Sequence, residues 1–270
     1  MAGWISTRDE VRLAVRRWEP DEPGDAAVVL VHGFSASKDD PSVVAVAEAL
    51  RDAGYAVVSY TARGHAESEG LCTLGDLEHL DVEAAVALAR EAADRVVLVG
   101  ASMGAIAVLR HGAEGERDAV DGVVTVSSPA EWRVPRTAQS AAAAALTQLA
   151  PGRWAARRFL DVRLAKGWSG ATPPVDLAAR LDAPLAVLHG TGDRFIKHAE
   201  AEKLYRAATG ERRLDLIERM GHAYMPESIP AIREAVAWAL AAHASGARAA
   251  DTEAEPTARH APPHPAPTET

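Results

Sequence analysis

The sequence contains only one cysteine, Cys72, among its 270 residues. An internal disulfide is therefore excluded, and a reducing compartment is the simplest location. The first residues carry charges without an apolar stretch, and no run reaches the roughly 18 apolar residues that a membrane-spanning helix needs. We expect a cytoplasmic protein with no signal peptide and no membrane span.

Basic residues are outnumbered by acidic ones. The chain has 29 lysines and arginines against 38 aspartates and glutamates, which gives a formal net charge of −9. Because an acidic chain repels phosphate backbones and no basic stripe stands out, nucleic acid is not an expected partner. No spacing of His, Cys, Asp and Glu resembles a zinc site, and no glycine-rich loop opens a helix as a dinucleotide site does, so no metal or cofactor is expected.

Apolar runs alternate with helix-forming segments along most of the chain, and 48% of the residues are hydrophobic. Short continuous apolar runs are typical of strands that are buried on both faces of a parallel sheet. The expected strands cover 10–18, 27–31, 55–60, 95–99, 123–126, 185–188 and 214–217, and the expected helices cover 40–54, 76–90, 103–111, 199–208 and 229–242. This alternation predicts an α/β fold with a mostly parallel, doubly wound sheet. Right-handed crossovers then place the loops that follow the strands on one sheet edge.

Two segments depart from the alternation. Residues 129–182 are too long for a single connection and contain good helix formers, so we predict a short helical lid inserted into one domain that spans 1–245. From 246 to 270 the composition becomes rich in Ala, Pro, Thr, Glu and His. That segment lacks the large apolar residues of a core, and we predict a disordered tail.

Large aromatic side chains gather in the predicted lid segment, at Trp132, Trp154, Phe159 and Trp168. They could line an apolar pocket for an acyl group, or they could pack the lid onto the body of the protein. Both interpretations remain open from the sequence. Under the first of them, Trp132 is the candidate substrate-binding residue.

The segment Gly100-Ala101-Ser102-Met103-Gly104 fits the pattern G-x-S-x-G. The segment RVVLV precedes it and AIAVL follows, which is the strand–turn–helix context that exposes a nucleophilic serine on a sharp turn. Small residues at both ends let the backbone turn without clashes. Ser102 is therefore the candidate nucleophile.

A serine hydroxyl needs an adjacent base, and the base needs a carboxylate that fixes its tautomer. His222 follows the last predicted strand, and Asp193 follows the strand before it in His189-Gly190-Thr191-Gly192-Asp193. Both loops are expected on the sheet edge that carries Ser102. The chain order Ser, Asp, His is also the order expected for a nucleophile of this type.

Acyl transfer further requires hydrogen-bond donors for the developing oxyanion. One donor is expected to be the backbone N–H of Met103, which directly follows the candidate nucleophile. The second is expected in the loop after strand 27–31, where the amide of Phe34 is favoured and that of Ser35 is the alternative. Phe34 is also a candidate for substrate contact.

The motifs HGFSASKDD, SYTARGHAESEG, GASMG, HGTGD and GHAY, taken in order, resemble the α/β-hydrolase superfamily, and within it bacterial esterase-, lipase- and serine-aminopeptidase-like members. The resemblance covers about residues 5–243. It implies an eight-stranded, mostly parallel sheet and an acyl-enzyme mechanism, with Ser102 as nucleophile, Asp193 as acid and His222 as base. It also implies that the amides of Phe34 and Met103 bind the oxyanion.

The sequence leaves three functions open. The first is hydrolysis of an ester or thioester of a small to medium acyl substrate. The second is cleavage of amide or peptide bonds, or acyl transfer, by the same three residues; an aminopeptidase would need an acidic group for the substrate amine, and Glu131 is the obvious candidate. The third is a binding protein on the same fold without turnover.

Overall fold

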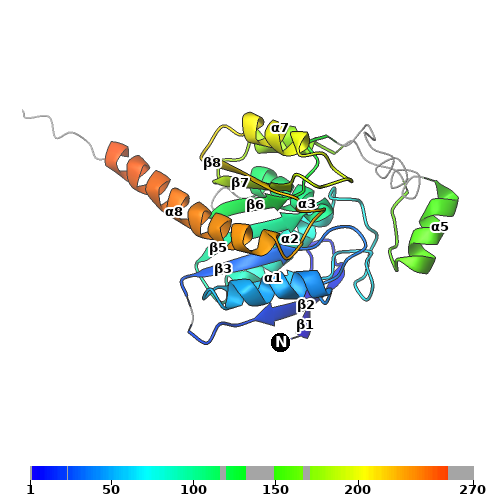
Figure 1. Ribbon diagram of the computed structural model, residues 1–270. Helices are drawn as coiled ribbons and strands as arrows, with labels where there is room; N and C mark the ends of the chain where they lie inside the picture. The colour runs from blue at the N-terminus through cyan, green and yellow to red at the C-terminus, as the bar shows by residue number, and fades with distance from the viewer. Residues whose placement is uncertain (1, 23, 116–119, 132–148, 167–170, 255–270) are drawn as a thin grey trace, which may run out of the picture.

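The computed structural model describes residues 2–22, 24–115, 120–131, 149–166 and 171–254. Within these residues, eight strands form one sheet in the order β1-β2-β4-β3-β5-β6-β7-β8. Helices cover both faces of the sheet (Figure 1). The pairs of β2 with β1 and with β4 are antiparallel, and all other neighbouring strands are parallel. The prediction of a mostly parallel, doubly wound α/β sheet is confirmed.

The elements occur in the expected alternation. The strands are β1 (Ala2–Ser6), β2 (Arg12–Trp18), β3 (Ala26–Val31), β4 (Ala56–Tyr60), β5 (Arg95–Ala101), β6 (Gly122–Val126), β7 (Leu185–Gly190) and β8 (Arg212–Ile217). The helices are α1 (Pro41–Arg51), α2 (Glu78–Ala89), α3 (Met103–Glu114), α5 (Ala150–Phe159), α6 (Pro174–Ala178), α7 (Ala199–Ala207) and α8 (Ser228–Ala254). None of these helices combines the length and the apolar character that crossing a membrane requires.

The central strands are buried on both faces, as their continuous apolar runs predict. In β3, Val29 and Val31 belong to one hydrophobic cluster, whereas Val28 and Leu30 belong to the other. The first cluster includes residues of α2, α3 and α7, and the second includes residues of α1 and α8. The sheet is therefore the middle of three layers, and its strand ends are fixed by packing from both sides.

The order of the strands reverses beside β3. The chain passes from β3 to β4 on one side and then returns to β5 on the other side. At such a reversal the loops after the two neighbouring strands diverge and leave a crevice at the carboxyl ends of the strands. The loops after β3 and β5 begin at His32 and Ser102, which places both predicted oxyanion donors beside the candidate nucleophile.

Strand β1 was not expected from the sequence. It pairs with β2 in antiparallel register, with Ala2 opposite Arg16. Most of its residues are exposed, and the indole of Trp4 lies under the Arg12 guanidinium at 4.5 Å from the ring centroid. An edge strand that is held mainly by backbone pairing has no apolar alternation, so no pattern in the sequence indicates it.

Helix α8 corrects two boundaries that the sequence predicted. The last helix was expected to end at residue 242 and disorder to begin at residue 246, yet the helix continues to Ala254 (Figure 1). The physical reason is local: residues 247–254 are rich in alanine, which has the highest intrinsic helix propensity. The predicted disorder of residues 255–270 lies outside the described residues.

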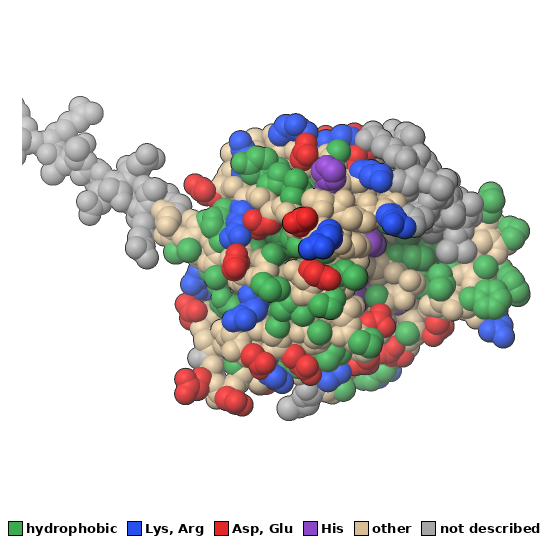
Figure 2. Space-filling view, in the orientation of Figure 1, with side chains coloured by type: hydrophobic (Ala, Val, Ile, Leu, Met, Phe, Trp, Pro, Cys, Tyr) green, Lys and Arg blue, Asp and Glu red, His purple; other side chains and the backbone are tan. Residues whose placement is uncertain are grey.

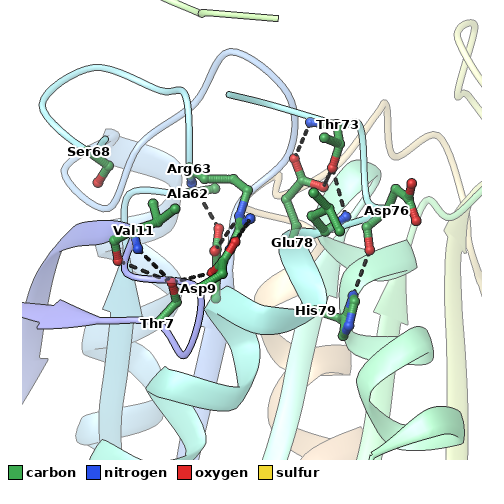
Figure 3. Close-up of polar contacts among 12 residues, drawn as sticks. Thr7, Asp9, Val11, Ala62, Arg63, Ser68, Thr73, Asp76, Glu78 and His79 are labelled. Atoms are coloured by element: carbon green, nitrogen blue, oxygen red, sulfur yellow. Dashed lines mark hydrogen bonds and ion pairs between the residues drawn. The ribbon is translucent and has the colours of Figure 1, made fainter. Parts of the chain in front are cut away.

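A buried arginine connects the loop after β4 to the turn between β1 and β2. Arg63 donates two hydrogen bonds to Asp9, at 2.9 and 3.0 Å, and its Nε donates to Asp81 in α2 at 2.7 Å. Figure 3 shows the guanidinium directed toward Asp9, with Thr7 and Val11 closing the turn beside it. The side chain of Asp81 is fully buried, whereas that of Asp9 is 37% exposed. These contacts fix the loop after β4 against α2 and against the turn between β1 and β2.

At pH 8 we expect Arg63→Met to lower the free energy of unfolding by about 3–5 kcal/mol, because it leaves the Asp81 carboxylate buried without its cation. Asp9→Asn serves as the control and is expected to cost about 1 kcal/mol or less, since this partner is partly exposed. Urea unfolding of both variants measures the difference. If both variants lose the same free energy of unfolding, Asp81 is not the carboxylate that needs the charge of Arg63.

The loss in Arg63→Met should also grow with pH. Burial raises the pKa of Asp81 to about 7, even though the charge of Arg63 opposes the rise. When the pKa of a carboxyl group is higher in the folded state than in the unfolded state, the free energy of unfolding falls as the pH rises from the unfolded pKa to the folded pKa. Removing the arginine raises the pKa further, so the deficit relative to the wild type is expected to be larger at pH 8 than at pH 5.

Candidate active site

Ser102 occupies a strained turn between β5 and α3. Its φ is +52° and its ψ is −111°, which is unfavourable for a residue with a side chain. The turn is possible because two glycines allow close approach of the backbone. A Cβ at Gly104 would lie 2.5 Å from the carbonyl oxygen of His32, and a Cβ at Gly100 would collide with the carbonyl oxygen of Gly104. Both glycines of the G-x-S-x-G pattern are therefore required by space.

We expect Gly104→Ala to lower kcat/KM by about 100-fold, because the new Cβ pushes α3 away from the loop after β3, and displacements near 1 Å can have effects of this size. Steady-state kinetics with an ester substrate measure the loss. Gly54→Ala is a suitable control for strain without a clash, since Gly54 has φ of +94° but a Cβ there meets no atom within 4 Å. An unchanged rate in Gly104→Ala contradicts the steric role.

The structure brings the three predicted side chains together. His222, in the loop after β8, places Nε2 at 3.0 Å from Ser102 Oγ. Its Nδ1 lies 2.7 Å from Asp193 Oδ2, in the loop after β7. Since an ionised carboxylate can only accept, Nδ1 of His222 carries the proton and Nε2 is left to accept the proton of the serine hydroxyl. Phe195 packs against the imidazole, with 4.9 Å between the ring centroids.

Asp193 is held as a carboxylate by several donors. Its Oδ1 accepts the backbone N–H groups of Phe195 and Ile196, at 2.8 and 2.9 Å. Its Oδ2 faces His222 and also Nε2 of His189 at 3.4 Å. Burial by itself raises the pKa of Asp193, but the hydrogen bonds from His189 and His222 outweigh it and hold the pKa well below its usual range. The acid is therefore ionised and fixed in orientation.

The structure also distinguishes the two candidate amides in the loop after β3. The N–H of Ser35 donates to Nε2 of His65 at 3.3 Å. Among the residues that the structure describes, the amides of Phe34 and Met103 have no acceptor. His32 accepts the N–H of Ala62 and faces the carbonyl of Gly33, and burial lowers the pKa of this histidine to about 3. His32 thus stays neutral under the loop.

Sequence reasoning missed two side chains that hold this site. His189 packs against Asp193, and Nε2 of the histidine also lies 3.0 Å from the carbonyl oxygen of Ile196. The hydroxyl of Tyr224, two residues after His222, reaches the carbonyl oxygens of Val31 at 2.9 Å and Val99 at 3.3 Å. Both residues stand inside the motifs HGTGD and GHAY, but their contacts join segments far apart in the sequence.

The segment after helix α5 pairs with the loop after β4. Backbone bridges join Val162 to His65 and Leu164 to Cys72, and Arg163 donates to the carbonyl oxygens of Ala66 and Ser68. Helix α5 itself projects from the body of the molecule (Figure 1), and hydrophobic side chains are prominent on the projection (Figure 2). The insertion of residues 129–182 as a lid stays a prediction.

Two of the aromatic residues expected in that segment do not pack onto the body. Trp154 is 64% exposed and Phe159 is 70% exposed, and their rings contact each other edge to face at 6.0 Å. The packing interpretation is therefore wrong for these two residues. Trp132, the candidate for substrate binding, and Trp168 lie outside the described residues.

Glu131, the candidate for binding a substrate amine, is paired with a cation of the protein. Its Oε1 accepts a hydrogen bond from Nζ of Lys203 at 2.9 Å, and the same Nζ also donates to Glu200. This pairing weakens the case for an aminopeptidase. In the described part of the chain, no group of three or more His, Cys, Asp or Glu residues is arranged to hold a metal ion.

Comparisons with known proteins give a family and a set of similar folds. Residues 22–166 match the family model described as serine aminopeptidase, S33. An esterase from Pyrococcus furiosus superposes with a TM-score of 0.69 at 21% identity, covering 89% of this chain and 90% of that chain. An esterase from a Rhodococcus species superposes with a TM-score of 0.63 at 21% identity, covering 89% and 98%.

A Butyrivibrio proteoclasticus protein with ferulic acid bound has the same architecture. The superposition has a TM-score of 0.64 at 19% identity and covers 90% of this chain and 99% of that chain. No curated protein matches the sequence significantly. At these low identities the solved structures show a shared fold.

Proposed function

Because the chain belongs to the hydrolase family described as serine aminopeptidase, S33, we propose that it is a serine hydrolase that cleaves carboxylic ester or thioester bonds of a small to medium acyl substrate. Ser102 is the nucleophile, His222 the base and Asp193 the acid that orients the base. The backbone amides of Phe34 and Met103 bind the oxyanion, and Phe34 contacts the substrate.

The reaction proceeds through an acyl-enzyme. Ser102 Oγ attacks the carbonyl carbon while Nε2 of His222 takes the hydroxyl proton, and the charge that develops on the carbonyl oxygen is stabilised by the two amides. The imidazolium then protonates the leaving alcohol or thiol. Water, deprotonated by the same Nε2, then attacks the acyl carbon. The bond from this carbon to Ser102 Oγ breaks, Nε2 returns the proton to Oγ, and the carboxylic acid is released.

The observation that carries the proposal is the continuous hydrogen-bonded path from Ser102 through His222 to Asp193, with heavy-atom distances of 3.0 and 2.7 Å. Both distances lie within the range for proton transfer to a general base. A histidine that only stabilised a loop would not need a carboxylate on one nitrogen and the hydroxyl of a strained serine on the other. The likeness to solved esterases supports the choice of an ester substrate.

A panel of p-nitrophenyl esters with graded acyl length, assayed beside acyl thioesters and aminoacyl p-nitroanilides, tests the proposal. We expect measurable turnover of esters, with a maximum that reports the length of the acyl pocket. Turnover of the anilides without turnover of the esters and thioesters contradicts an esterase.

The second candidate function is hydrolysis of amide or peptide bonds, which the description of the family favours. The same three residues carry out both reactions, because both pass through the same acyl-enzyme. The aminoacyl p-nitroanilides of the panel separate the two functions. Glu131→Gln adds a second criterion, because it should raise KM for these anilides only if the carboxylate binds the substrate amine.

A further inference from the structure

Ser127 directly follows β6 and has an unusual backbone conformation. Its φ is +51°, in the left-handed region, and its side chain is fully buried. Residues other than glycine, asparagine and aspartate rarely adopt this conformation, and when they do they concentrate at functional sites, where the surrounding structure maintains the strain. The sequence analysis assigned no role to Ser127.

The hydroxyl of Ser127 holds the loop that carries the base. Its Oγ accepts the backbone N–H of Ala223 at 3.1 Å, and Ala223 is the residue directly after His222. Ala223 also lies in the left-handed region, with φ of +62°. The backbone therefore bends immediately beside the imidazole, and the serine hydroxyl supplies the hydrogen-bond acceptor for the amide of this bend.

The same strand end also holds the nucleophile. The carbonyl oxygen of Val126, the residue before Ser127, accepts the N–H of Ser102 at 2.9 Å. The N–H of Ser127 in turn donates to the carbonyl oxygen of Leu188 in β7 at 2.9 Å. Val126 therefore bonds to the nucleophile Ser102, and Ser127 bonds to the residue that follows the base His222. A change at Ser127 is transmitted to that contact through one hydrogen bond and one peptide unit.

We propose that Ser127 is a positioning residue that fixes the loop of His222 relative to Ser102 through its hydroxyl. This role rests on the proposed function of the site. Without the acceptor, the amide of Ala223 is left unpaired beside the base, and the imidazole leaves the orientation in which Nε2 accepts the proton of Ser102. Because efficiency depends steeply on this geometry, chemistry slows while binding of the substrate is unaffected.

Two substitutions separate the hydroxyl from the backbone strain. Ser127→Ala removes the hydroxyl and keeps the strain, whereas Ser127→Gly removes the hydroxyl and adopts the left-handed conformation freely. Ser128→Ala is the matched control, because Ser128 is also buried but its hydroxyl donates only to the adjacent carbonyl of Pro129 at 3.0 Å.

We expect both Ser127 variants to lower kcat by about 10- to 100-fold with KM unchanged, and Ser128→Ala to retain the wild-type rate. The rate of covalent labelling of Ser102 by a fluorophosphonate should fall by the same factor, and thermal unfolding identifies any variant that does not fold. Wild-type kcat in Ser127→Gly overturns the role of the hydroxyl, as does a loss that appears in KM alone. A wild-type protein that neither hydrolyses esters nor reacts with the fluorophosphonate contradicts the proposed function, and this proposal with it.

Discussion

Ser102→Ala is expected to lower kcat for an ester substrate by roughly 10⁴- to 10⁶-fold, because the attacking oxygen is removed while the amides and the binding surface remain. Stability should change little. Alanine tolerates the φ of +52° no worse than serine does, and the hydroxyl contributes one hydrogen bond, to a partly exposed histidine. Steady-state kinetics and thermal unfolding measure the two effects separately.

A covalent probe makes this test independent of the choice of substrate. Wild-type protein should gain one fluorophosphonate adduct by intact mass, and Ser102→Ala should gain none. Ser245→Ala is a suitable control, since its hydroxyl is exposed and donates only to the carbonyl of Ala241 within α8. A Ser102→Ala protein that keeps full turnover excludes Ser102 as the nucleophile, whatever the substrate.

The sequence predicted the central part of the fold because the signals there are local. The runs at 27–31 and 96–99 are apolar at every position, and strands that are buried on both faces of a parallel sheet have this pattern. Strand β1 has no comparable signal, because its residues 2–6 are mostly exposed and are held by backbone pairing. The extension of α8 was missed for a related reason, since helix formation by alanine-rich sequence does not require a buried face.

The three predicted side chains could be assigned to one edge of the sheet from the sequence. The motif locates only Ser102, and the topology of the sheet locates the loops that carry Asp193 and His222. A G-x-S-x-G turn locates Ser102, and parallel strands with right-handed crossovers bring the ends of β7 and β8 to the same edge. The contacts of Ser127 with Ala223 and of Tyr224 with Val31 depend on the detailed path of loops. No spacing in the sequence encodes them, because the partners are separated by 96 and 193 residues.

The environment of Asp193 determines what an amide would do in its place. Its Oδ1 accepts two backbone N–H groups, so in Asp193→Asn the carbonyl oxygen of the side chain must remain at that position. The NH₂ group is then forced to face Nδ1 of His222, at the position where Oδ2 lies 2.7 Å away. A donor there requires Nδ1 to accept, which moves the imidazole proton to Nε2 and turns that nitrogen from an acceptor into a donor toward Ser102.

Asp193→Asn is therefore expected to lower kcat by about 10⁴-fold through the wrong histidine tautomer, with the fold and KM largely retained. The fluorophosphonate reaction of Ser102 should slow in proportion, which separates loss of base catalysis from loss of substrate binding. Asp161→Asn is the matched control, because Asp161 has an exposed side chain in the segment after α5. A rate for Asp193→Asn within tenfold of the wild type contradicts the role of Asp193 as the orienting acid. The backbone amides of Phe195 and Ile196 hold the side chain in one orientation. A flip of the asparagine amide, which would return its oxygen to Nδ1 of His222, is therefore unfavourable.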